Sequence, residues 1–230
     1  MWLAFVDSDD WVEPDMFRTL IDAALEHGTA IAGGAPFNER TDGTWTNNFA
    51  DVPSGIVSGR RCNLDVLYQT RHAWGAVWGK VYRRELFDGV RFPLASNLED
   101  YVVMTQMYER VDRIWFCSRP LYHHRVREGS LSSGAFSREK MRAVDAAVAI
   151  RDTFVSSGAD GELVAGADSL VFRMYASMLW ECRRAGFDER PQILAERRGG
   201  AVLAAWRWTC HSRKRKSDLK LLAMLAAGLV

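Results

Sequence analysis

The sequence predicts an α/β fold followed by a helical C-terminal region, and three observations support this. Short apolar runs at residues 1–6 and 29–34 end abruptly at polar residues, as buried strands of a parallel sheet do. An amphipathic helical pattern lies between these runs, and from Ser137 onward the pattern is helical to residue 230. With 230 residues, 48% of them hydrophobic and 26% charged, the chain can bury a substantial core.

The N-terminal elements follow from the apolar spacing and from the residues that interrupt it. Pro14 suits the first position of a helix, whose apolar spacing continues to His27-Gly28. The second apolar run then predicts a strand. Residues 35–58 are rich in Gly, Pro, Asn, Asp and Thr, so we expect a long loop with a strand near Ile56-Val57.

The remaining elements alternate before the chain becomes helical. The pattern predicts a helix near 59–70, a Trp-rich segment to Pro93, a helix near 98–110, and strands near 113–117 and 120–126. Breaks in the C-terminal helices are expected at 156–161, 185–191 and 199–200. We therefore expect two domains, residues 1–133 and residues 137–230.

Charge and cysteine usage restrict the function class and the compartment. The formal net charge of +1 gives no indication of a nucleic-acid partner. Acidic residues nevertheless outnumber basic ones in residues 1–100, and the reverse holds in residues 181–220. The 4 cysteines are far apart with no C-x-x-C pair, which is typical of reduced, mostly buried thiols in a cytoplasmic protein. The longest apolar run, 221–230, is too short to span a bilayer.

Three carboxylates, Asp7, Asp9 and Asp10, follow the first apolar run. Ligands of open α/β sheets bind beyond the carboxyl ends of the strands, and a cation offsets the repulsion between clustered carboxylates. Oxygen ligands favour Mg²⁺ or Mn²⁺. The alternative is an Asp-rich turn that caps the helix starting at Pro14.

Two further segments carry side chains suited to chemistry. Glu99 and Asp100 open a predicted helix, where the macrodipole favours acids and where a carboxylate can also accept a proton from a hydroxyl group. Trp74 and Trp78, separated by small residues, can form a flat platform for a sugar ring, and Lys80 beside them can meet a phosphate or carboxylate. Burial of these tryptophans in the core is the alternative.

A basic strand and turn at residues 122–130 contains His123, His124 and Arg125. Neighbouring side chains of a strand point to opposite faces, so at most one of the two histidines can reach a metal ion.

The order of these segments resembles the family 2 glycosyltransferases, in particular the bacterial enzymes that build capsules, exopolysaccharides and cell-wall polymers. The motifs are F-V-D-S-D-D-W-V at 5–12, G-K-V-Y-R-R-E-L-F at 79–87, R-F-P at 91–93, E-D at 99–100, and P-L-Y-H-H-R at 120–125 with G-S-L-S at 129–132. The resemblance covers residues 1–133 and is looser beyond residue 137.

The resemblance implies a Rossmann-like GT-A fold and transfer of a sugar, with inversion, from a nucleotide diphosphate donor. By this likeness Asp9 coordinates a Mn²⁺ or Mg²⁺ ion that bridges the donor diphosphate, and Asp7 lies near the donor ribose or the metal. Asp100 resembles the catalytic base, with Glu99 as the alternative. His124 resembles a histidine that some relatives place on the metal.

The same likeness implies partners and a location. Trp78, Lys80 and Arg125 join Asp7 as residues expected to bind donor or acceptor. The expected donor is a UDP- or GDP-sugar, and the expected acceptor is a glycan or a lipid-linked glycan in the cytoplasm. Family members carry a nucleotide-binding half upstream of the D-x-D motif, whereas this sequence starts at the D-x-D strand. We therefore expect a partial GT-A domain from a truncated enzyme.

Other functions remain open from the sequence alone. A Mg²⁺-dependent phosphatase of the haloacid dehalogenase type also has D-x-D after an apolar strand, but Gly and Thr typically follow there, in place of Asp10-Trp11. An inactive remnant or binding module is the other alternative. At the C-terminal end, the basic run Arg213–Lys216 precedes a leucine-rich stretch, which predicts either contact with the inner membrane surface or a last helix packed on the domain.

Overall fold

The computed structural model divides the chain into two compact units. It describes residues 1–40, 42–47, 53–71, 74–93, 98–126, 136–185, 190–211, 219 and 222–223. The first unit comprises Met1–Val66, Thr70–Phe92 and Val103–Ser133, and the second comprises Leu67–Gln69, Pro93–Val102 and Gly134–Val230.

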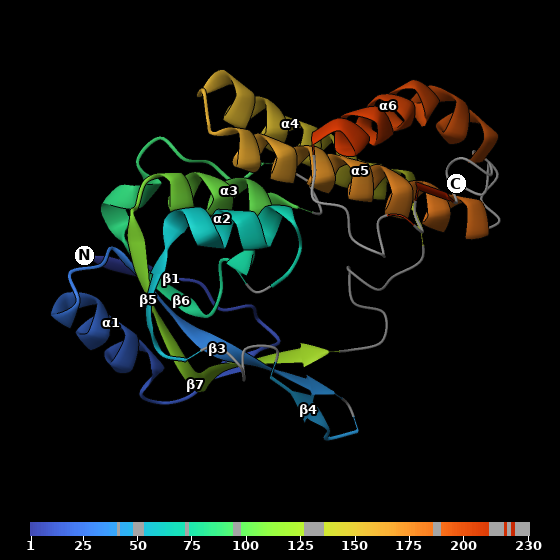
Figure 1. Ribbon diagram of the computed structural model, residues 1–230. Coiled ribbons are helices and arrows are strands. Elements are labelled where there is room, and N and C mark those ends of the chain that lie inside the picture. The colour runs from blue at the N-terminus through green and yellow to red at the C-terminus, as the bar shows by residue number, and fades with distance from the viewer. Residues whose placement is uncertain are drawn as a thin grey trace. The chain divides into compact units, whose positions relative to one another are not determined.

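The first unit is built on a mixed seven-stranded sheet (Figure 1). Its strands are β1 (Trp2–Ala4), β2 (Trp11–Val12), β3 (Ile31–Arg40), β4 (Trp45–Thr46), β5 (Gly55–Ser58), β6 (Lys80–Arg83) and β7 (Arg113–Val126). The order is β1-β6-β3-β7-β2, with β4 beside β3 and β5 beside β7. The expected parallel sheet is wrong: among the described pairs only β3 and β7 run parallel, because β6 enters antiparallel between β1 and β3.

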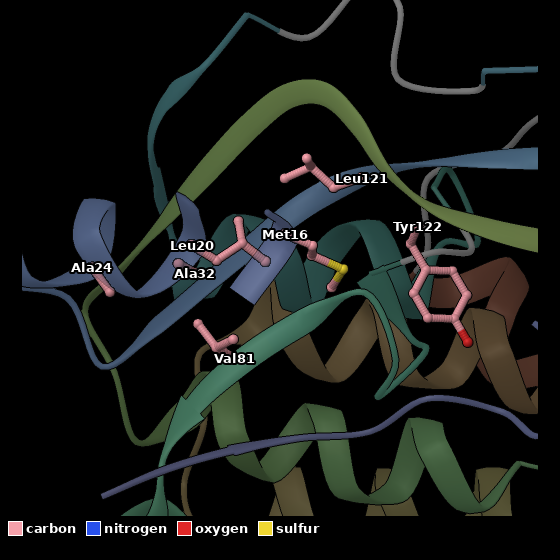
Figure 2. Packing of buried hydrophobic residues seen from close by; sticks show 7 residues of the cluster. All are labelled: Met16, Leu20, Ala24, Ala32, Val81, Leu121 and Tyr122. Atoms are coloured by element: carbon pink, nitrogen blue, oxygen red, sulfur yellow. The ribbon is translucent and has the colours of Figure 1, made fainter. Parts of the chain in front are cut away.

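Helix α1 (Met16–Glu26) packs on one face of this sheet. The sequence predicts Pro14 at the first helical position, whereas the helix starts two residues later, with Asp15 as its N-cap. Its buried side chains at Met16, Leu20 and Ala24 are spaced four apart and therefore share one helix face. Figure 2 shows them against the strand residues of the same cluster, Ala32, Val81, Leu121 and Tyr122. This cluster joins α1 to β3, β6 and β7.

Helices α2 (Gly59–Leu67) and α3 (Glu99–Glu109) lie side by side (Figure 1), close to the lengths predicted. Helix α3 packs on the face of the sheet opposite α1. Val81 of β6 belongs to the cluster that contacts α1, and the next residue, Tyr82, points to the other face of the sheet. The Tyr82 hydroxyl donates to the Val77 carbonyl and contacts Met104 Sδ of α3. The sheet is thus covered on both faces.

The second unit contains three helices, α4 (Arg142–Ser156), α5 (Gly161–Arg184) and α6 (Arg190–His211). Helix α5 packs against both others (Figure 1), and Arg151 of α4 donates to the buried Asp168 of α5 at 2.7 Å. The breaks expected at 156–161 and 185–191 are confirmed. The break expected at 199–200 is wrong, because α6 continues through Gly200. Glycine is needed there for packing, since an added Cβ would overlap the Tyr175 hydroxyl of α5.

Other differences from the sequence prediction lie in the strands. The expected loop at 35–58 holds the end of β3 and strand β4, which pair as a hairpin. The strands expected at 113–117 and 120–126 form one strand of 14 residues, β7, whose pairing with β3 shifts register around Ala35. None of the described helices is both long and apolar enough to cross a membrane. All 4 cysteines are free thiols; Cys62 and Cys182 are buried, whereas Cys210 is exposed.

Candidate active site

The acidic cluster forms a tight turn between β1 and β2. The Asp10 amide donates to the Asp7 carbonyl at 3.1 Å, which closes the turn. The side chains of Asp7 and Asp9 are exposed, whereas Asp10 is partly buried. The turn therefore presents two of its three carboxylates at the surface of the first unit.

Tyr122 of β7 holds this turn in place. Its hydroxyl donates to Asp10 Oδ2 at 2.7 Å and accepts a hydrogen bond from the Asp7 amide at 3.1 Å. The second oxygen of Asp10, Oδ1, accepts from the amide of Arg125 at 2.9 Å. Both carboxylate oxygens of Asp10 are thus engaged in fixing the turn to the end of β7.

The environment of Tyr122 keeps its phenol protonated. Burial raises the pKa of Tyr122 well above its usual value, and the hydrogen bond to the Asp10 carboxylate raises this pKa further. The phenol consequently remains a hydrogen-bond donor throughout the physiological range. The sequence places Tyr122 in the 120–125 motif but gives no signal for its contact with Asp10, which is more than one hundred residues away in the chain.

The donor set of the turn fits a hard divalent cation. Asp7 and Asp9 supply exposed carboxylates on a backbone fixed by Tyr122, and Mg²⁺ is commonly bound by one or two carboxylates with water and substrate phosphates. In the described part of the chain, no three or more His, Cys, Asp or Glu side chains are grouped to hold a metal. The structure therefore does not gather Asp7, Asp9 and His124 into one ligand cluster.

The ring of Trp78, in the loop before β6, lies beside His124 of β7. The Trp78 ring stacks with His124 at a centroid distance of 5.4 Å and with Tyr122 at 4.6 Å. His124 Nδ1 lies 3.1 Å from Asn38 Oδ1 on the neighbouring strand β3. These contacts fix both rings close to the tyrosine that holds the acidic turn.

The expected tryptophan platform at residues 74–80 is largely wrong, because most of this segment is core. Trp74 is 3% exposed and its carbonyl accepts from the buried Tyr108 hydroxyl at 2.8 Å. Lys80 is also 3% exposed, and its ammonium donates to the Ala76 carbonyl at 2.6 Å. Lys80 thus secures the 76–79 loop from inside, whereas the Arg125 side chain is exposed as donor or acceptor binding requires.

Glu99 and Asp100 form the first turn of α3, as expected. Glu99 Oε2 is buried and has no hydrogen-bond partner among the described residues. Beside it, burial raises the pKa of Tyr101 to about 12, and the neighbouring Asp100 carboxylate contributes to this increase. The G-S-L-S motif at 129–132 lies outside the described residues.

The chain matches several curated glycosyltransferases over part of their length, while no family model matches it. It is 30% identical over 162 residues to the glycosyltransferase GlyA of Streptococcus pneumoniae, covering 68% of this chain and 23% of the relative. It is 28% identical to the putative glycosyltransferase EpsH of Bacillus subtilis, covering 56% and 39%. It is 26% identical to the succinoglycan biosynthesis protein ExoO of Rhizobium meliloti, covering 67% and 45%. The chain thus spans less than half of these curated relatives.

Solved structures confirm the fold class. The chain superposes on S. aureus TarS 1–349 in complex with UDP-GlcNAc with a TM-score of 0.58 and 17% identity, covering 98% of this chain and 63% of TarS. A mixed sheet flanked by helices matches a partial GT-A-like α/β fold. Sequence similarity and fold therefore agree that this chain is similar to glycosyltransferases of polysaccharide synthesis.

Proposed function

We propose that the protein transfers a sugar, with inversion, from a UDP- or GDP-sugar to a glycan or lipid-linked acceptor. The observation that carries this proposal is the Asp7–Asp10 turn, which Tyr122 fixes and in which Asp7 and Asp9 are exposed. Similarity to named glycosyltransferases supports the reaction class, and the UDP-GlcNAc bound to TarS supports a nucleotide-sugar donor in general.

Inverting transfer requires a base and charge neutralisation but no covalent nucleophile. A carboxylate removes the proton of the acceptor hydroxyl as that oxygen attacks the anomeric carbon and the nucleotide diphosphate departs. We assign the base to Asp100, with Glu99 and its unpartnered buried oxygen as the alternative.

The residues proposed to hold the metal are Asp9 and, beside it, Asp7. A Mn²⁺ or Mg²⁺ ion bound there supplies positive charge for the leaving diphosphate. The task of the chain itself is to keep these carboxylates in place, which the Tyr122 hydroxyl and the Asp10 carboxylate do through hydrogen bonds.

The test is a transfer assay on the purified protein, expressed together with the upstream nucleotide-binding half that family members carry before the D-x-D motif. UDP- and GDP-sugars are supplied with Mn²⁺ or Mg²⁺ and simple glycoside acceptors, and release of the nucleotide is measured with and without a chelator. We expect release that depends on both metal and acceptor, and a product whose anomeric configuration is inverted by NMR.

Two outcomes would replace this function. Absence of calorimetric binding for every nucleotide sugar at millimolar concentration favours a remnant or binding module. Release of phosphate from a chromogenic phosphate ester favours the Mg²⁺-dependent phosphatase.

We further propose that the protein works in the cytoplasm at the inner membrane surface. Helix α6 exposes Val202, Leu203 and Trp206, the last at 59%, and the basic run Arg213–Lys216 lies farther along, outside the described residues. Apolar and basic side chains in one segment suit an anionic lipid surface. Sedimentation with anionic vesicles at low salt tests this, and neutralising Arg213 and Lys214 to Gln is expected to reduce pelleting. A wild-type protein that stays in the supernatant contradicts the proposal.

A further inference from the structure

A hollow of about 220 Å³ opens in the first unit next to the acidic turn. Trp11, the residue after Asp10, forms one wall, and the hairpin of β3 and β4 forms the other. Its lining residues are Trp11, Phe37, Glu39, Gly43, Trp45 and His123. We call this the aromatic hollow.

The walls of the aromatic hollow are ring faces and edges held in fixed orientations. Trp11 stacks on His123 at a centroid distance of 3.4 Å with an interplanar angle of 9°. Phe37 meets Trp45 edge to face at 4.6 Å and 77°. Two large apolar rings remain exposed despite this packing, Trp11 at 40% and Trp45 at 61%.

Polar contacts hold the stacked rings of Trp11 and His123 in place. Trp11 Nε1 donates to Glu39 Oε2 at 3.3 Å, and His123 Nε2 lies 2.9 Å from Glu13 Oε1. Each contact is made at a ring nitrogen, on the edge of the ring, and Trp11 stays 40% exposed. Exposed aromatic rings whose orientation is already set bind a flat ligand with little loss of side-chain entropy.

The composition of the aromatic hollow points to a neutral sugar ring. A pyranose has faces lined by C–H groups, which carry partial positive charge and pack on the electron-rich faces of tryptophan. Its hydroxyl groups can donate to Glu39, because a carboxylate only accepts hydrogen bonds. Glu13 and Glu39 are both acids, so a diphosphate or another anion is disfavoured. The volume of the hollow is below the roughly 300–1,000 Å³ of sites for drug-sized ligands, and this smaller size suits a single sugar ring.

We propose that the aromatic hollow is a subsite for one neutral sugar ring of the acceptor glycan. This inference rests on the proposed glycosyltransferase function and places a part of the acceptor beside the Asp7–Asp10 turn. This proposal places the aromatic platform at Trp11 of β2 and Trp45 of β4 and not at Trp74 and Trp78.

The test uses indole NMR signals of the full chain labelled with ¹⁵N-tryptophan, assigned through Trp11→Phe and Trp45→Phe. The probes are the methyl glycosides of glucose, galactose and N-acetylglucosamine. We expect saturable shifts of the Trp11 and Trp45 signals at millimolar glycoside, while the fully buried Trp208 does not move. Trp45→Ala is expected to weaken this binding about tenfold, the equivalent of 1.4 kcal/mol, whereas Trp45→Phe retains most of it.

Trp180→Ala is the matched control, because Trp180 lies on α5 in the second unit, where the Arg184 guanidinium lies over its ring, and it does not line the aromatic hollow. It is expected to leave glycoside binding unchanged. Thermal unfolding of each variant separates loss of binding from loss of folding. If Trp45→Ala unfolds, Glu39→Gln replaces it and is expected to weaken binding while keeping the ring contacts.

Donor binding, measured by calorimetry on the same samples, reports the proposed function separately. A nucleotide sugar that binds while no glycoside moves Trp11 or Trp45 overturns the subsite and leaves the glycosyltransferase proposal standing. Glycoside shifts in a protein that binds no nucleotide sugar support the subsite and contradict the transfer reaction. Equal shifts with UMP or GMP overturn the subsite, since the hollow then binds a nucleobase.

Discussion

The two acidic clusters of this protein contain the same kind of side chain but treat it differently. In the Asp7–Asp10 turn, both oxygens of Asp10 accept hydrogen bonds, from Tyr122 and from the Arg125 amide. At the start of α3, one oxygen of Glu99 is buried with no partner among the described residues. Carboxylates that look alike in the sequence thus differ in their hydrogen bonding, and the difference for Asp10 comes from Tyr122 and Arg125, which are distant in sequence.

The largest effect is expected at the start of α3. Asp100→Asn should lower the transfer rate by a factor of about 10² to 10⁴, because a positioned general base contributes that much, while donor binding stays near normal. Glu99→Gln is the paired variant and should keep most of the rate. Initial rates and donor titrations on both variants check this. Full turnover in Asp100→Asn together with a loss in Glu99→Gln would move the base to Glu99.

A smaller effect is expected at Asp9 in the turn. Asp9→Asn keeps the shape but removes the charge facing a divalent ion, so metal-dependent donor binding should weaken by at least the roughly 10- to 100-fold seen when a metal site loses a supporting group. Calorimetry with a UDP- or GDP-sugar at fixed Mn²⁺ measures it. Ser8→Ala, in the same exposed turn, is the control and should bind as the wild type does. Equal affinities for Asp9→Asn and wild type would remove Asp9 from the metal site.

The hydrogen bond between Asp10 and Tyr122 should affect mainly the stability of the fold. Tyr122→Phe leaves the Asp7 amide and Asp10 Oδ2 without the hydroxyl they share, so the free energy of unfolding should fall by about 1–3 kcal/mol. Urea denaturation measures this value. A double-mutant cycle with Asp10→Asn should show that the two changes are not additive. Additive losses would mean that the hydrogen bond between Tyr122 and Asp10 does not couple them.

The smallest effect is expected at Asp15, an acid in the same unit whose ion pair with Arg119 at 2.6 Å is exposed. The hydrogen bond from Arg119 lowers the pKa of Asp15. The contribution of this ion pair to folding stability is therefore present above the usual carboxyl pKa, and it is lost as the pH falls through the lowered pKa of Asp15. Because exposed pairs contribute little, Asp15→Asn should leave the unfolding midpoint in urea unchanged at pH 7. A clear loss there would show that exposure is a poor guide to which carboxylates matter.

The local sequence pattern was sufficient to predict the helices whose ends are marked by proline, glycine or serine. Pro14 and His27-Gly28 bound α1, and the Ser/Gly-rich stretch at 156–161 separates α4 from α5 as predicted. The direction of β6 could not be obtained in this way, since an apolar run reports burial and not strand orientation. Gly200 was misleading for a related reason: a glycine can mark a break or a close contact, and here it faces Tyr175.

The residues of the candidate site also differ in whether the sequence could predict them. The motif located the acidic turn, and the structure confirms that Asp7 and Asp9 are exposed there. The role of Asp10 depends on Tyr122, more than one hundred residues later in the chain, and no local pattern shows such a contact. The tryptophan spacing at 74–78 was ambiguous between platform and core, and the Tyr108 hydroxyl bound to the Trp74 carbonyl is part of a packed interior.

The buried ammonium group of Lys80 has a practical consequence for labelling this protein. The sequence has only five lysines, and the two in the described residues, Lys80 and Lys140, are both buried. Lys140 also lies 3.3 Å from the Glu181 carboxylate. The basic surface of the described residues is therefore arginine, which amine-directed esters do not modify. The remaining lysines of the sequence, Lys214, Lys216 and Lys220, are therefore the expected attachment points for a dye or a surface linker, and they are far from the acidic turn in sequence.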